Sequence, residues 1–142
     1  MRDFFNRLHL TSAIAPVAAR TDNTAIVSSI IDRSGYEGLV FALNIGANTD
    51  ANATFAVLIE DGDAANLSDA AAVADEFLSG TEALAGFTFA DDNETRKIGY
   101  KGSKRYVRMT VTPTGNDSGN IFLSALALLF GNRYGATANP SQ

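Results

Sequence analysis

Apolar residues alternate with polar ones along several short segments, a pattern that predicts β-strands. The first three candidate strands span residues 25–31, 38–45 and 53–60, and turn-forming residues separate them. In the second and third strands, apolar side chains recur at every other position: Leu39, Phe41, Leu43 and Ile45, then Phe55, Val57 and Ile59. Short strands at this even spacing are typical of a β-sandwich or barrel.

Residues 96–113 show the alternation most clearly and predict a β-hairpin with a glycine-containing turn at 101–104. The return strand places three apolar side chains on one face: Val107, Met109 and Val111. We therefore expect that face to lie in the core. The opposite face, which carries basic residues, is expected to be solvated.

The remaining internal segments are less regular. Residues 86–90 predict another strand. The alanine-rich segment 69–78 predicts a short helix, with an irregular crossover as the alternative. Residues 120–130 form a nearly unbroken apolar run, which fits either a strand buried on both faces or a buried helix.

The two ends of the chain differ from this pattern. Residues 1–23 predict an N-terminal arm whose apolar side chains could share one face of a short helix: Phe4, Phe5, Leu8 and Leu10. Two interpretations stay open, a poorly ordered terminus or an arm that docks on a neighbouring subunit. Residues 132–142 lack periodicity and predict a C-terminal tail, which leaves 24–131 as the folded domain.

Together these segments predict an all-β protein, a jelly-roll-like antiparallel β-sandwich with at most one short helix and extended terminal arms. The 142 residues are enough for one domain with a sizeable core. The longest apolar run, 125–130, is far shorter than a membrane span, and the N-terminus lacks the apolar centre of a signal peptide. We therefore expect no membrane partner, and synthesis in the cytoplasm.

Composition argues against several kinds of catalysis. The chain has no cysteine, so it has neither a disulfide nor a thiolate nucleophile. His9 is the only histidine and lies in the predicted arm, which leaves no base for a catalytic triad. Paired carboxylates for glycoside hydrolysis remain possible, but the chain has no tryptophan to line a sugar-binding cleft. We expect a protein without enzymatic activity and without a cofactor.

Charge is unevenly distributed along the chain, whose net charge is −5. Six of the eleven basic residues lie in the predicted hairpin, and ten of the sixteen acidic ones lie between residues 60 and 94. Nucleic acid is therefore an unfavoured partner. The basic residues are expected to meet carboxylates of the same chain, a sister subunit or another protein. The candidate interface residues in this region are Lys101, Lys104, Arg105 and Arg108.

One acidic segment has the spacing of a cation-binding loop. Asp61, Asp63, Asn66 and Asp69 offer oxygen ligands, but the closing glutamate of an EF-hand is missing. A solvated acidic loop is the favoured interpretation, and we predict no metal ligands.

Several stretches carry a family resemblance: I-I-D-R-S-G-Y-E at 30–37, T-D-A-N-A-T-F at 49–55, D-D-N-E-T-R-K-I-G-Y-K-G-S-K-R-Y-V-R at 91–108 and T-P-T-G-N at 112–116. With them the chain resembles small virion structural proteins of tailed bacteriophages, of the head decoration (cement) type. The resemblance implies a β-sandwich on the outside of the major capsid protein shell, often as a trimer of sister copies, that stabilises the mature head. It implies no catalytic residues.

Two other functions remain open. A head–tail connector or tail component would form a ring of defined copy number, whereas a decoration protein would cover the shell. A carbohydrate- or host-surface-binding β-sandwich module would bind glycans or host cells as an isolated protein.

Overall fold

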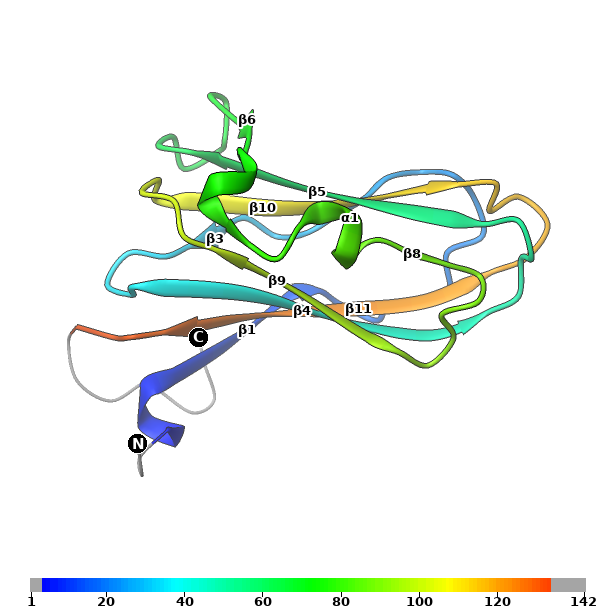
Figure 1. The fold of residues 1–142 in the computed structure, drawn as a ribbon, viewed down its shortest axis with the longest axis horizontal. Helices are drawn as coiled ribbons and strands as arrows, with labels where there is room; N and C mark the ends of the chain where they lie inside the picture. Colours follow the sequence, from blue (N-terminus) through cyan, green and yellow to red (C-terminus); the bar gives the residue numbers. More distant parts are fainter. Residues whose placement is uncertain (1–3, 134–142) are drawn as a thin grey trace.

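The computed structural model describes residues 4–133, and residues 1–3 and 134–142 lie outside this description. Two antiparallel β-sheets pack face to face, with a single short α-helix at one side (Figure 1). The predicted all-β sandwich is therefore confirmed. Most of the predicted tail, 132–142, falls outside the described residues.

Sheet A has five strands in the order β1 (Leu8–Ile14), β11 (Ile121–Phe130), β4 (Gly38–Asn48), β9 (Thr95–Tyr100) and β7 (Leu78–Ser79). Sheet B has six, with the path β2 (Ile26–Val27), β10 (Tyr106–Thr114), β5 (Thr54–Gly62) and β6 (Ala71–Ala72). In addition, β3 (Ile31–Asp32) pairs with β10 and β8 (Phe87–Thr88) pairs with β5. The helical segments are the 3-10 turns η1 (Phe5–Arg7) and η2 (Asp75–Phe77) and the helix α1 (Glu82–Ala85).

The core between the sheets is built from the side chains that the alternation predicts. Phe41, Ile59, Val107, Met109 and Val111 are all fully buried. Each of them lies at an alternate position of a long strand, and the intervening side chains point outward. The period of two therefore identifies the inner face of each long strand correctly.

The predicted hairpin at 96–113 is wrong, although both of its strands exist. β9 pairs with β4 and β7 in sheet A, whereas β10 pairs with β5, β2 and β3 in sheet B. The connection 101–105 thus crosses from one sheet to the other. Both strands alternate because both face the same core from opposite sides, so the pattern is identical to that of a hairpin.

The predicted helix at 69–78 is also not formed. This segment instead supplies β6, the turn η2 and β7, and the Val73 N–H donates to the Ile59 carbonyl at 2.9 Å. Pairing with the edge of β5 therefore overrides the helix propensity of the alanines. The α-helix lies later, at α1, where the Thr81 hydroxyl accepts the Leu84 N–H at 3.2 Å as an N-cap.

Part of the predicted arm belongs to the sheet. Residues 8–14 form β1, which pairs along β11 from Leu8 opposite Phe130 to Ile14 opposite Ala125. The short helix expected near Phe4 and Phe5 is reduced to the single 3-10 turn η1. The partner strand explains the change, since β11 offers a complete row of backbone groups to residues 8–14.

The apolar run at 120–130 forms a strand, β11, and not the alternative buried helix. It is buried on one face only. Ile121, Leu123 and Ala125 face the core, but the other side of the strand leaves Phe122, Leu126 and Phe130 exposed. A nearly continuous apolar strand therefore supplies both the core and an apolar outer surface.

Candidate functional site: the outer face of sheet A

The outer face of sheet A carries large apolar side chains along its second strand, β11. Phe122 is 54% exposed, Leu126 46% and Phe130 41%, and Leu128 between the last two is half-buried. We call these four residues, with Val40 and Ala42 of the neighbouring strand β4, the apolar face. Aromatic and aliphatic side chains gathered on one sheet face are typical of a contact surface.

The register of sheet A aligns these residues with their neighbours in rows across the strands. Leu128 lies opposite Val40 of β4 and, on its other side, opposite Leu10 of β1. Leu126 lies opposite Ala42, which in turn lies opposite Lys97 of β9. The apolar face thus extends over the middle of the sheet and ends at a lysine.

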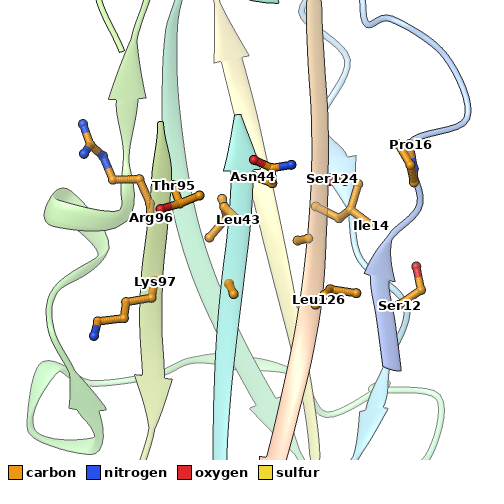
Figure 2. A pocket seen from close by; sticks show the side chains of 12 residues that line it. Ser12, Ile14, Pro16, Leu43, Asn44, Thr95, Arg96, Lys97, Ser124 and Leu126 are labelled. Carbon is orange, nitrogen blue, oxygen red and sulfur yellow. The ribbon is translucent and has the colours of Figure 1, made fainter. Parts of the chain in front are cut away.

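A shallow hollow of about 660 Å³ lies on this side of the sheet, between β1, β11, β4 and β9 (Figure 2). Ala42 lies in the middle of the hollow. In the cross-strand row, this small residue stands between Leu126 of β11 and Lys97 of β9. The next row consists of three polar side chains from three strands: Ser124, Asn44 and Thr95. The hollow is therefore apolar along one row and polar along the next.

Charge is distributed very unevenly between the two sheets. No strand of sheet A contains an aspartate or a glutamate, although the chain has sixteen acidic residues. Lys97 makes no ion pair with any residue in the range 4–133. The other basic side chain of β9, Arg96, turns to Asp91 and Glu94 at the edge of the sheet.

The basic residues predicted as an interface lie at or beyond the 101–105 crossover, and three of them have partners in their own chain. Lys104 pairs with Asp63. Arg105 binds both carboxylate oxygens of Asp32, at 3.0 and 2.8 Å. These hydrogen bonds hold the pKa of Asp32 below its usual range.

The remaining two predicted basic residues differ from each other. Arg108 lies directly opposite Glu60 on the outer face of sheet B, and its guanidinium donates to one Glu60 oxygen at 3.1 and 2.8 Å. Lys101 is exposed and makes no ion pair with another described residue. Three of the four predicted basic residues therefore pair with carboxylates of the same chain.

A network of hydrogen bonds around Arg33 and Tyr100 holds the backbone of the 101–105 crossover in place. The Arg33 guanidinium donates to the carbonyls of Gly102 at 2.6 Å and Lys104 at 3.0 Å, and lies over the Tyr100 ring. The Tyr100 hydroxyl donates to Asp61 at 2.5 Å and accepts the Lys104 N–H at 3.1 Å. Burial, together with the Asp61 carboxylate, raises the pKa of Tyr100, so the phenol stays protonated.

The acidic loop considered as a cation site is organised by its own backbone. Asp69 accepts the N–H groups of Asp63 at 2.8 Å and Ala64 at 3.1 Å, which lowers its pKa. Asn66 accepts the Ser68 N–H at 3.1 Å. Among residues 4–133, no group of three or more His, Cys, Asp or Glu side chains could hold a metal ion.

The predicted interface residues of the N-terminal segment lie beside the apolar face. Phe4 and Phe5 are 53% and 69% exposed at the turn that precedes β1. Leu8 begins β1 opposite Phe130. The sequence did not single out Phe122, Leu126 or Phe130, because an apolar run alone does not show which of its faces is covered.

The opposite end of the sandwich is closed by a buried carboxylate. Asp50 is 1% exposed and accepts the N–H groups of Asp117 at 3.0 Å and Ser118 at 2.8 Å, and the Ser118 hydroxyl at 3.1 Å. These bonds hold the pKa of Asp50 below its usual range. They join the loop that follows β4 to the loop that precedes β11.

In the described part of the chain, no helix is long and apolar enough to cross a membrane. No protein-family model matches the sequence, and no curated protein matches it.

Comparison with solved structures finds relatives in fold. The PBSX exported protein XepA has a TM-score of 0.52 and 15% identity, over 94% of this chain and 40% of XepA. The SPBc2 prophage-derived protein YomS has a TM-score of 0.47 and 12% identity, over 86% of this chain and 93% of YomS. The CBM32 module of AlyQ, solved with 4,5-unsaturated mannuronic acid, has a TM-score of 0.37 and 14% identity, over 89% of this chain and 97% of the module.

These comparisons concern the fold. The chain is a β-sandwich distantly similar in fold to XepA, and it spans less than half the length of XepA.

Proposed function

We propose that this chain is a non-enzymatic virion structural protein of a tailed bacteriophage, of the head decoration type. It attaches through the outer face of sheet A to the outside of the major capsid protein shell and stabilises the mature head. The apolar face carries this proposal. Side chains such as Phe122, Leu126 and Phe130 form the dry centre of protein interfaces, where charged residues are depleted, and sheet A contains no carboxylate.

The sequence resemblance to cement proteins supports the choice of partner. A cement protein stabilises a shell to the extent that it binds the mature shell more tightly than its precursor. Many sister copies on one shell let a modest interface act collectively. A rigid β-sandwich with one apolar outer face suits this task, because it presents its contact side chains already ordered.

The test uses phage heads that lack the protein, to which the purified chain is added back. Leu126→Glu places a charge in the apolar face and is expected to lower occupancy about tenfold or more. Leu84→Glu is the matched control, since Leu84 is 72% exposed on α1, which packs against β5 and β9 and contributes no residue to the apolar face. It is expected to bind like the wild type.

Two results would contradict the proposal. Wild-type protein that does not bind heads would exclude the decoration function. Density for a single ring at the portal vertex, in place of copies spread over the shell, would assign the protein to the head–tail connector or the tail.

A further inference from the structure

We infer that the hollow beside Lys97 is the socket for an aspartate or glutamate side chain that projects from an otherwise apolar partner surface. This inference rests on the proposed function and specifies the chemistry of the partner's contact. The partner is thus a protein whose contacting patch is apolar around one carboxylate.

The shape of the socket follows from the register of three strands. Ala42 lies between Leu126 and Lys97, with neighbouring strands about 4.8 Å apart, and the polar row of Asn44 lies two residues further, about 6.7 Å along the strand. Since the Ala42 side chain is a single methyl group, the longer side chains around it leave a depression. Leu126 borders the hollow on one side. Lys97 borders it on the other, but its side chain extends from β9 away from β4 (Figure 2), so its ammonium group would have to swing over Ala42 to meet an inserted side chain.

Within residues 4–133, the donors around the hollow have no acceptor. The side chains of Ser124, Asn44 and Thr95 make no hydrogen bond with another residue in the range 4–133, and Lys97 has no ion pair there. An ammonium group offers three donors and no acceptor, while hydroxyl and amide groups can donate beside it. A carboxylate has the complementary chemistry, because it only accepts.

Lys97 shares this lack of an ion pair with Lys101 and differs from the other basic residues nearby. Arg96, Lys104, Arg105 and Arg108 are each paired with a carboxylate of the same chain. Lys97 lies on a sheet whose strands contain no acidic residue, and no carboxylate among residues 4–133 pairs with it, which leaves its charge available to another molecule. Charge complementarity therefore selects an acidic group.

The surroundings of the hollow favour a protein as the source of that group. The apolar face continues along β11 from Leu126 to Leu128 and Phe130, which a small acid would leave uncovered. Nucleic acid is disfavoured by a net charge of −5, and of the two basic residues that line the hollow, Arg96 is already paired with Asp91 and Glu94. Docking an apolar surface would exclude water from the Lys97 contact, and such a contact orients the partner.

The experiment measures attachment of Lys97→Met and Lys97→Glu to heads that lack the protein. Lys97→Met keeps much of the side-chain volume and removes the charge, and is expected to weaken binding about tenfold, with a larger loss for Lys97→Glu. Leu84→Glu, which lowers the net charge by one unit as Lys97→Met does, is the control for net charge and is expected to bind like the wild type. Raising the salt concentration should weaken the wild type more than Lys97→Met. Thermal unfolding of each variant checks that the fold is intact.

The outcomes separate this inference from the proposed function. If Leu126→Glu fails to bind while Lys97→Met binds like the wild type, the attachment face stands and the socket is overturned. If wild-type protein does not bind heads at all, both are overturned. A third outcome is that an oligouronate binds the isolated protein through Lys97 while Lys97→Met attaches to heads like the wild type. The hollow would then be a glycan-binding site, and the inference of a protein carboxylate would be overturned.

Discussion

The Phe130 ring lies directly over Gly38, its cross-strand partner on the outer face of sheet A. A Cβ atom added to Gly38 would come within 2.1 Å of the Phe130 Cζ atom. At the other end of the same strand, a Cβ on Gly46 would come within 3.0 Å of the Phe122 Cβ. Glycines on β4 thus make room for both phenylalanines of β11, so that Phe130 lies flat on the sheet.

Gly38→Ala is expected to displace the Phe130 ring at a cost of about 1 kcal/mol or less, because the ring is partly exposed and can rotate away. Gly119→Ala is the contrast, since its Cβ would come within 2.7 Å of the Asp50 backbone nitrogen, which cannot move independently. We expect a loss of about 1–3 kcal/mol there. Urea unfolding of both variants measures the difference, and equal losses would contradict it.

Asp50 is expected to contribute to acid sensitivity. Its folded-state pKa is lowered by hydrogen bonds from Ser118, Asn52 and Asp117. The stability that it contributes is therefore fully present above the unfolded pKa of about 3.9 and is lost as the pH falls through the lower folded value. Asp50→Asn should be less stable than the wild type at pH 7, with a difference that shrinks below about pH 3.5. Urea unfolding at several pH values checks this, and a difference independent of pH would refute it.

Tyr100→Phe removes the hydroxyl that joins Asp61 to the crossover backbone. We expect a loss of about 1–2 kcal/mol in the free energy of unfolding, because a hydrogen bond to a carboxylate disappears and the Lys104 N–H loses its acceptor. Tyr106→Phe is the matched control, since it keeps the ring beside the Arg105 guanidinium, and should change stability by less than about 0.5 kcal/mol. Similar losses in both variants would argue against the network.

Reversing Lys104 and Arg105 to glutamate is expected to weaken attachment to heads. The ion pairs with Asp63 and Asp32 give this prediction two possible causes, a lost contact with the shell or a disturbed crossover. The compensated variant, which also carries Asp63→Lys and Asp32→Arg, restores both pairs with the charges exchanged.

Occupancy on heads distinguishes the two causes. If the compensated variant binds normally, the basic residues act through the fold of the crossover. If it stays defective while its thermal unfolding matches the wild type, the residues contact the shell. Full occupancy of the uncompensated double variant would remove them from the interface.

The sequence predicted the strands and their inner faces well, but not the sheets to which they belong. Val107 and Ile98 point into the same core from opposite sheets, and a period of two reports only that a side chain faces the core. A loop of five residues is short enough for a hairpin and long enough for a crossover. Sheet assignment therefore depends on long-range pairing, which local pattern does not contain.

The candidate site could be predicted less well from the sequence, because it also depends on long-range strand pairing. The pairing of Arg108 with Glu60 depends on the register of β10 with β5, across 48 residues. The exposure of Leu126 depends on the absence of a third layer over sheet A among the described residues. Lys97 belonged to the basic segment seen in the sequence, but its lack of an ion pair with residues 4–133 appears only once β9 is assigned to sheet A.

The chain passes between the two sheets at both ends of the sandwich, through 49–53 and 115–120 at one end and through 101–105 at the other. A mechanical load applied to sheet A by an expanding shell would therefore reach sheet B through covalent backbone at both ends. Sliding of one sheet over the other would have to stretch these connections as well as disrupt side-chain packing. The fold is thereby suited to resist shear in the plane of the proposed attachment surface.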